Sequence, residues 1–397
     1  MKLRWVLFLL LNSILFQGGF GADTSYEIKL RIKNYKGTVC YLGYPYGDKK
    51  YLTDTAEVNG QGEFVFSGSK ALDGGLYFIY AGPPSTIYFD LIVAENNFSI
   101  ETDSLDLIGQ MKVKGSLENQ LFFDFQRFMR EKQKSASEVS DRLKAASDEV
   151  EKEKLNQQLI KLDSEVKSYR DNLIQKNSQT FAAHFIKSTI NIEVPESPKD
   201  SNGKEIDPHF GYHYYKAHYF DNVDFSDARM LRTPNFYSRI EEYMEKMTVK
   251  HPDSIIASAH VVIEKARANK EVFRYCVVNI THKYETSNIM GMDAVFVDLA
   301  ENYYLSGDAF WADAELISKI QDRVNRLKPN LLGKPAPKMV LLDTLLKPFS
   351  ITSIKTPFTV LYFYDPDCGH CKKKTPQLRD LYNSKLKSLG VTVVGAN

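Results

Sequence analysis

Cysteine is scarce in this sequence, with four residues among 397. Small secreted scaffolds that depend on disulfides carry more, and a chain of this length can bury cores without them. Cys40 in TVCYLGY and Cys276 in EVFRYCVVNI lie in apolar runs, so we interpret both as buried small hydrophobic residues. A bridge between these two stays open, because sequence alone does not determine connectivity. Cys368 and Cys371 form the one closely spaced pair.

The sequence also lacks an excess of charge of either sign. Its 51 Lys and Arg residues balance 50 Asp and Glu residues, which leaves a formal net charge of +1. Such a chain has no long-range field that attracts nucleic acid or an acidic membrane, so we expect no nucleic-acid partner. Beyond the first residues, no run reaches the about 18 apolar residues of a membrane span, so we expect no stable span after signal cleavage.

The first 22 residues have the pattern of a secretory signal peptide. Lys2 and Arg4 precede a short apolar stretch, residues 5–16, and small residues up to Ala22 suit cleavage. No cysteine near the cleavage region offers a lipid anchor, and a retained N-terminal helix is the alternative. We therefore expect residues 1–22 to be removed and the rest exported to an oxidising compartment, where disulfide chemistry operates.

Residues 23–115 carry the pattern of a strand-rich domain. In YEIKLRIKN, Ile28, Leu30 and Ile32 alternate with charged residues, which predicts a half-buried strand. Further strands are predicted in GEFVFSG, GLYFIYA, STIYFDLIV and NFSIET, and turn signals separate them. Short strands at this spacing predict an antiparallel β-sandwich.

Residues 116–330 change to helical periodicity, which predicts an α-helical domain. A capping box formed by Ser135 and Glu138 indicates a helix start there. Apolar residues from Leu155 to Leu173 recur every three or four positions and predict a stripe that packs on another helix of the chain, with an oligomer seam as the alternative. The surrounding charges are mixed in sign, so they indicate a solvated outer face.

Three histidines, His209, His213 and His218, are the candidate metal ligands of the helical region. Histidines four positions apart on a helix suit a metal ion, but Gly211 is expected to interrupt the helix and no further ligands follow at suitable spacing. We interpret these histidines as packed or surface residues, with a metal site as the alternative.

Residues 331–397 predict an α/β unit. The continuous apolar run PFTVLYFY is typical of a strand buried on both faces of a sheet. FYDPDCGHCKKKTP follows at residues 363–376, then a helix that ends near Gly390, then the strand VTVVGAN. Cys368 and Cys371 are thereby placed at a strand's C-terminal end and a helix N-terminus, where open α/β sheets carry their sites.

This placement predicts dithiol chemistry. A helix N-terminus presents unpaired N–H groups and partial positive charge, which stabilise a thiolate, the reactive form of cysteine. We therefore predict Cys368 as the attacking thiolate and Cys371, one turn further, as the residue that resolves the mixed disulfide. Gly369 would permit a tight turn. His370 would favour the thiolate and bring the couple nearer about −180 than −270 mV, and Lys372 would add positive potential.

Four other functions of a C-x-x-C pair are less well supported by the sequence. Zinc needs a second pair of ligands, and haem attachment needs His directly after the second cysteine, where this chain has Lys372. A thiol peroxidase would carry Thr or Ser three residues before its cysteine, where Asp365 stands. An inert structural disulfide is the fourth alternative. We expect neither a metal nor an organic cofactor.

The segment from about Leu331 resembles the thioredoxin fold, in the TlpA/ResA-type branch of envelope thiol:disulfide oxidoreductases. GKPAP, FTVLYFY, CGHC, Lys372 and Pro376 carry the resemblance. It implies that Pro376 kinks the active-site helix. It also implies protein dithiols and disulfides as substrates, a redox partner in the envelope, and location in the periplasm or cell envelope of a Gram-negative bacterium. The upstream regions resemble two domains of unknown function found before such modules, and TPNFYSRIEEYMEK and NKEVFRYCVVNITHKYE look like the helical one.

Two departures from that family affect the expected activity. Asp367 occupies the place of the usual Trp before the first cysteine, and its carboxylate would raise the thiol pKa. The family's later strands and its cis-proline loop have no counterpart after VTVVGAN, so we expect a C-terminally truncated, incomplete thioredoxin-like module with an exposed sheet edge. Completion of the sheet by another chain is the alternative. The alternative function is therefore a redox-inactive envelope binding or scaffold protein.

Overall fold

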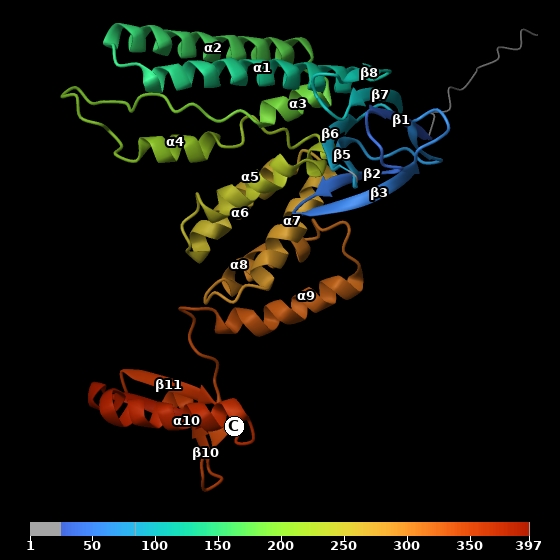
Figure 1. Ribbon diagram of the computed structural model, residues 1–397. Coiled ribbons are helices and arrows are strands. Elements are labelled where there is room, and N and C mark those ends of the chain that lie inside the picture. Colours follow the sequence, from blue (N-terminus) through green and yellow to red (C-terminus); the bar gives the residue numbers. More distant parts are fainter. Residues whose placement is uncertain (1–24, 84, 397) are drawn as a thin grey trace, which may run out of the picture. The chain divides into compact units, whose positions relative to one another are not determined.

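The computed structural model describes residues 25–83 and 85–396 (Figure 1). The signal peptide predicted at residues 1–22 lies outside the described residues. The observed elements confirm the predicted multidomain order, in which a β-sheet region precedes a helical middle and an α/β module. The chain divides into two compact units, of which the first ends at Ile280 and the second begins at Thr281.

The first unit opens with eight strands in two four-stranded sheets. The strands are β1 (Tyr26–Lys33), β2 (Val39–Tyr46), β3 (Lys49–Glu57), β4 (Phe64–Gly68), β5 (Gly75–Ala81), β6 (Ile87–Val93), β7 (Asn97–Asp103) and β8 (Lys112–Lys114). One sheet has the order β4-β1-β7-β8 and the other β3-β2-β5-β6. Every strand that the sequence pattern predicted is present.

The alternating pattern of these strands produces the predicted sandwich core. Ile28, Leu30 and Ile32 of β1 are buried, while the charged residues between them face out. The Tyr26 hydroxyl links the two sheets because it donates to an Asp54 carboxylate oxygen at 2.6 Å. One pair departs from the antiparallel expectation, since β1 and β7 run parallel. A parallel pair needs a long crossover, and the whole second sheet supplies it between these two strands.

Helices follow the sandwich. They are α1 (Leu117–Ala145), α2 (Glu149–Lys176), α3 (Phe181–Ser188), α4 (Phe210–His218), α5 (Pro234–Glu245), α6 (Pro252–Ala266) and α7 (Lys270–Glu285), with the short 3-10 helix η1 (Ala228–Arg232) before α5. The capping box predicted at Ser135 and Glu138 is wrong, because both residues lie inside α1. The helix starts are capped instead by Ser116 and Asp148, whose side chains accept backbone N–H groups three residues on.

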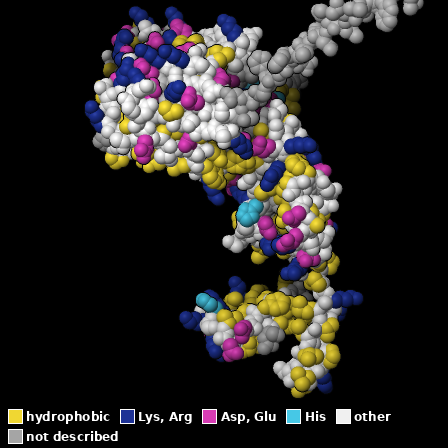
Figure 2. All heavy atoms as spheres, turned by 90° about the vertical axis from the view of Figure 1, so that its right-hand side faces the viewer, with side chains coloured by type: hydrophobic (Ala, Val, Ile, Leu, Met, Phe, Trp, Pro, Cys, Tyr) yellow, Lys and Arg dark blue, Asp and Glu magenta, His cyan; other side chains and the backbone are white. Residues whose placement is uncertain are grey.

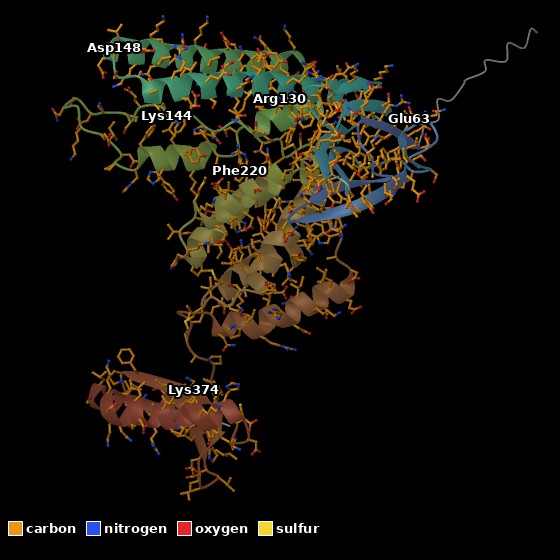
Figure 3. All side chains as sticks on the ribbon, viewed as in Figure 1. Glu63, Arg130, Lys144, Asp148, Phe220 and Lys374 are labelled. Carbon is orange, nitrogen blue, oxygen red and sulfur yellow. The ribbon has the colours of Figure 1, made fainter. Side chains whose placement is uncertain are left out.

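Helices α1 and α2 form a long hairpin, and the apolar stripe of α2 faces α1, as predicted. Phe128 and Tyr169 stack with ring centroids 3.9 Å apart, and Lys132 pairs with Glu165 at 2.7 Å. Lys144 lies near the end of the hairpin where the chain turns (Figure 3). Charges of both signs intermix over this part of the surface, which fits a solvated face (Figure 2).

The second unit begins with its own helical core. Its helical elements are α8 (Asp293–Leu299), the π-helical turn η2 (Ala300–Tyr304), α9 (Ala314–Leu327) and the 3-10 turn η3 (Lys328–Asn330). Phe296, Val297, Ala300 and Val324 form a buried cluster between these elements.

The α/β module ends the described chain. A hairpin of β9 (Val340–Leu342) and β10 (Pro348–Ser350) comes first, followed by the 3-10 turn η4 (Ile351–Ser353). The elements β11 (Phe358–Phe363), α10 (Gly369–Leu381), the turns η5 (Tyr382–Leu386) and η6 (Lys387–Leu389), and β12 (Val391–Ala396) then form a βαβ unit. Strands β11 and β12 pair in parallel, and Gly390 ends the crossover with a left-handed φ of 70°.

The expectation that β11 is buried on both faces is wrong for the described residues. Phe358 and Phe363 at its two ends are 69% and 65% exposed. Within the described chain β12 is the only sheet partner of β11, so no further strand covers these side chains. Hydrophobic side chains accordingly gather on the surface of the module that contains the C-terminus (Figure 2).

Candidate active site

The two cysteines of the C-terminal module lie where strand β11 gives way to helix α10. Asp365 forms the turn between β11 and α10. Its side chain accepts the Asp367 N–H at 2.8 Å, and its carbonyl accepts the Cys368 N–H at 3.1 Å. Cys368 has an extended backbone and is the N-cap of α10. Its carbonyl accepts the first helical N–H, from Lys372, at 3.0 Å. The chain thus passes from a strand through a tight acidic turn into a helix. This order leaves the Cys368 sulfur beside the free N–H groups of the first helical turn.

Hydrogen bonds lower the pKa of the Cys368 thiol. The backbone N–H of Cys371 contributes most, followed by the backbone N–H of His370 and then the Cys371 thiol, whereas the negative charge of Asp365 acts in the opposite direction. Both cysteines are free thiols and partly exposed. The arrangement has a thiol shifted toward its reactive form, a second thiol within hydrogen-bond reach, and access from solvent.

The structure changes the reasons given for three neighbouring residues. Gly369 is not needed for a tight turn, because its φ lies outside the left-handed region and an added Cβ would meet no other atom within 4 Å. It is the first residue of α10, where most residue types fit. The carboxylate that raises the Cys368 pKa belongs to Asp365, not to the predicted Asp367. His370 acts through its backbone N–H, and its side chain is exposed.

Pro376 lies inside α10, as the resemblance implied. Proline has no N–H, so the Lys372 carbonyl lacks its usual helical partner. Sequence reasoning missed the residue before it. Thr375 donates to the Cys371 carbonyl at 2.8 Å, and its hydroxyl lies 3.2 Å from the Tyr362 hydroxyl of β11. Thr375 thereby ties the second cysteine's turn to the strand.

The histidines of α4 do not form a metal site with one another in the described structure. His213 contacts Asp207 at 2.6 Å and His218 contacts Asp221 at 2.7 Å, so each has its own surface partner. The expected helix break at Gly211 is wrong, because this residue lies in the first turn of α4, where N–H groups have no helical partner.

A different histidine cluster went unnoticed in the sequence. His184 Nδ1 lies 3.0 Å from Asp227 and 3.3 Å from Asp224, and Nε2 lies 3.0 Å from the Ser178 carbonyl. Arg229 donates to the same Asp227 carboxylate at 2.7 Å. Although burial opposes it, hydrogen bonds from His184 and Arg229 lower the pKa of Asp227, and the bond to Asp227 raises that of His184. His184, Asp224 and Asp227 are residue types that bind metals, but here they form an ion-pair network with Arg229.

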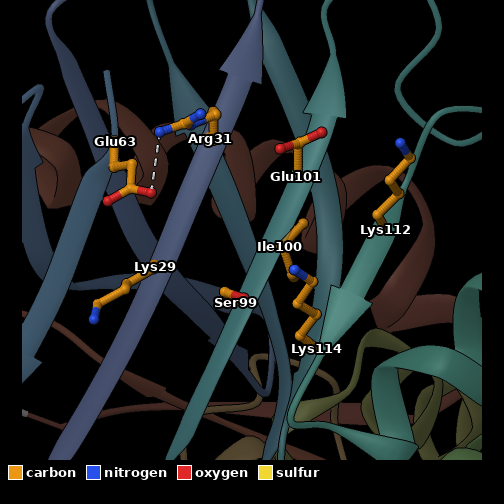
Figure 4. A pocket seen from close by; sticks show the side chains of 8 residues that line it. All are labelled: Lys29, Arg31, Glu63, Ser99, Ile100, Glu101, Lys112 and Lys114. Carbon is orange, nitrogen blue, oxygen red and sulfur yellow. Dashed lines mark hydrogen bonds and ion pairs between the residues drawn. The ribbon is translucent and has the colours of Figure 1, made fainter. Parts of the chain in front are cut away.

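A hollow of about 470 Å³ lies on the outer face of β1, β7 and β8 (Figure 4). Its walls mix positive and negative side chains with one serine and one isoleucine: Lys29, Arg31, Glu63, Ser99, Ile100, Glu101, Lys112 and Lys114. Arg31 contacts Glu63 at 3.3 Å, and no nucleophilic thiol or histidine lines the hollow. The dithiol of α10 therefore remains the better candidate for covalent chemistry. Among the described residues, no helix is long and apolar enough to cross a membrane.

Comparison with known proteins assigns three consecutive parts of the chain. Residues 26–122 match the family described as domain of unknown function DUF4369, residues 130–330 match domain of unknown function DUF5106, and residues 332–397 match the AhpC/TSA family. A solved structure titled as a thioredoxin-like protein from Bacteroides caccae is 17% identical, with a TM-score of 0.37; the match covers 52% of this chain and 74% of that one. No curated protein matches the chain.

The three family matches agree with the elements seen in each part. The C-terminal module is a thioredoxin-like domain of the AhpC/TSA type, and such a domain supports a redox-type function. The model for the helical region covers just over half of the sequence. The chain belongs to the DUF5106 family.

Proposed function

We propose that this protein is a thiol:disulfide oxidoreductase that works through Cys368 and Cys371. The observation that carries the proposal is the place of Cys368 at the N-terminus of α10, where two backbone N–H groups and the Cys371 thiol lower the pKa of its thiol. A lower pKa raises the fraction of thiolate at neutral pH, and the thiolate is the attacking species in disulfide exchange.

The proposed reaction proceeds in two exchanges. The Cys368 thiolate attacks one sulfur of a substrate disulfide, so that a Cys368–substrate bond forms and the other substrate sulfur leaves as a thiolate that takes up a proton. Cys371 then loses its proton and attacks the Cys368 sulfur, which releases the second substrate thiolate. Two electrons pass to the substrate, and the enzyme ends with a Cys368–Cys371 disulfide. The same steps in reverse oxidise a substrate dithiol.

We assign supporting roles to the neighbours of the pair. The open space above Gly369 gives a substrate disulfide room to approach the Cys368 sulfur. His370 donates its backbone N–H to that sulfur, and Lys372 fixes the first helical hydrogen bond. Pro376 interrupts the backbone ladder of α10 one turn beyond Cys371.

Protein dithiols and disulfides are the proposed substrates, together with a redox partner that restores the active form of the pair. The signal-peptide pattern of residues 1–22 supports export, and disulfides persist in oxidising compartments such as the periplasm or cell envelope. Both cysteines are partly exposed, which suits a macromolecular substrate.

The test is a redox titration of the full chain in glutathione buffers, read by thiol alkylation and mass spectrometry. We expect a reversible two-electron couple near about −180 mV that disappears in both Cys368→Ser and Cys371→Ser. Cys40→Ser and Cys276→Ser are the matched controls and should leave the couple unchanged. A pair that never forms a bridge, or a bridge that the buffers cannot reduce, would show a redox-inactive binding or scaffold protein. Consumption of hydrogen peroxide by Cys368 alone would indicate a peroxidase instead.

A further inference from the structure

The outer face of the sheet β3-β2-β5-β6 carries an exposed group of aromatic side chains. The register places residues of β2, β5 and β6 side by side, because Tyr41 pairs with Tyr80 and Tyr80 with Tyr88. Phe78 pairs with Asp90 in the next row. We call the following residues the aromatic patch: Tyr41, Lys50, Phe78, Tyr80, Tyr88 and Asp90.

The rings of the aromatic patch form two stacks. Tyr41 and Tyr80 stack with centroids 6.1 Å apart, and Phe78 and Tyr88 stack at 5.6 Å. Tyr80 and Tyr88 remain 40% and 44% exposed. Leu76 of β5 is buried, whereas Leu52 of β3, which pairs with Gly43 beside Phe78, is exposed next to the patch. Solvent therefore reaches two organised aromatic side chains instead of scattered ones.

A polar relay runs through these rings. Lys50 Nζ donates to the Tyr88 hydroxyl at 3.2 Å and lies 5.0 and 5.4 Å from the ring centroids of Tyr88 and Phe78. Tyr88 is in turn hydrogen-bonded to Asp90, whose pKa is raised because burial desolvates its carboxyl group. One basic and one acidic side chain share the relay, so the aromatic patch has no large excess of charge to attract an ionic ligand.

Two kinds of partner fit this face poorly. An extended peptide cannot add as a strand to β2 or β5, which carry Tyr41 and Tyr80, because each already pairs with a neighbour on both sides. An aromatic side chain presents about 150–250 Å², so the exposed parts of Tyr80 and Tyr88 offer roughly 150–200 Å² together. That is far below the about 800 Å² per partner of a standard protein interface.

We propose that the aromatic patch binds an uncharged oligosaccharide. A sugar ring has an apolar C–H face that can lie against Tyr80 and Tyr88, and hydroxyl groups around its rim that can bond to the Tyr88 hydroxyl, Lys50 and Asp90. Small-ligand sites are usually lined by aromatic side chains with a few polar groups at defined positions. A hydrogen bond to the charged ammonium group of Lys50 strengthens the recognition of a neutral hydroxyl.

Affinity electrophoresis of the purified full chain tests the proposal. The gels contain one neutral polysaccharide each (amylopectin, a β-1,3-glucan, a β-1,4-xylan or a galactomannan), with the anionic polygalacturonate as a comparison. We expect at least one neutral polymer to retard the protein and the double variant Y80A/Y88A to bind about 10-fold more weakly. Y88F keeps the ring but removes the relay hydroxyl, so it should lose less affinity than Y80A/Y88A. Tyr212→Ala, an equally exposed tyrosine on α4, should bind like the wild type.

Three results would overturn the proposal: no retardation by any neutral polymer, equal retardation of Y80A/Y88A, or retardation by polygalacturonate alone. Thermal melting shows whether Y80A/Y88A is folded, and Y88F covers the case in which it is not. The variant C368S/C371S should bind as strongly as the wild type, which separates this site from the proposed redox function.

Discussion

The two pairs of cysteines in this protein carry the same thiol group but lie in different surroundings. Cys40 on β2 and Cys276 on α7 are fully buried among apolar side chains, and desolvation raises the pKa of both thiols, that of Cys40 to about 12. Cys368 faces the N–H groups of a helix start, which lower the pKa of its thiol. The first unit thus keeps its thiols protonated, whereas the second presents a thiol prepared for attack. Position in the fold decides which cysteines can react.

The largest expected effect is on alkylation. In native protein at pH 7, iodoacetamide should modify Cys368 at least about 10³-fold faster than Cys40, because a pKa of about 12 leaves almost no thiolate. Mass spectrometry of digested, time-quenched samples measures both rates. Denaturation in urea should bring all four cysteines to similar rates. Equal rates in the native protein would remove the contrast between the two pairs.

Stability should respond to the buried pair and not to the exposed one. Cys40→Ser places a hydroxyl without a planned partner in the core, which should cost about 1–3 kcal/mol of unfolding free energy. Cys371→Ser, on the partly exposed helix, should change it by less than about 0.5 kcal/mol. Urea denaturation of both variants gives the comparison. If Cys371→Ser were the less stable of the two variants, Cys371 and not Cys40 would be the cysteine that stabilises the fold.

The His184 network adds a pH dependence to the first unit. The pKa of His184 is raised in the folded protein, so its charged form stabilises the fold fully below about pH 6.5 and this stabilisation is lost as pH rises through the folded value. His184→Gln should therefore cost about 1–2 kcal/mol at pH 5.5 and less at pH 9. Denaturation curves at the two pH values test this. His218→Gln, a surface histidine with one acidic partner, is the control and should show a smaller difference.

The smallest effect concerns the charge beside the dithiol. Asp365→Asn keeps an oxygen that can accept the Asp367 N–H but removes the negative charge that raises the Cys368 pKa. The pH profile of Cys368 alkylation should shift to lower pH in this variant. Asp367→Asn should shift it less, since its charge is not among the main influences on the thiol. A larger shift in Asp367→Asn would restore the interpretation drawn from the sequence.

Local patterns predicted the elements better than they predicted the contacts between them. Period-two alternation located β1, and the place of Cys368 at a helix start followed from the apolar strand before it. The cluster of His184 and Asp227 was invisible because these residues are 43 positions apart and carry no common spacing. Ser135 resembled a cap because cap chemistry depends on the backbone, which sequence does not show. The prediction that β11 is buried was wrong because the burial of a strand depends on the layers that cover it, not on its own composition.

The acidic turn before Cys368 has a second consequence, for solubility. The segment from Phe358 to Tyr364 is uncharged, rich in β-branched and aromatic residues, and largely uncovered, which is the composition of segments that stack into ordered aggregates. Lys355 precedes it and Asp365 ends it, and charges at both ends discourage such stacking. The carboxylate that makes Cys368 a weaker acid therefore also guards the most aggregation-prone strand of its module.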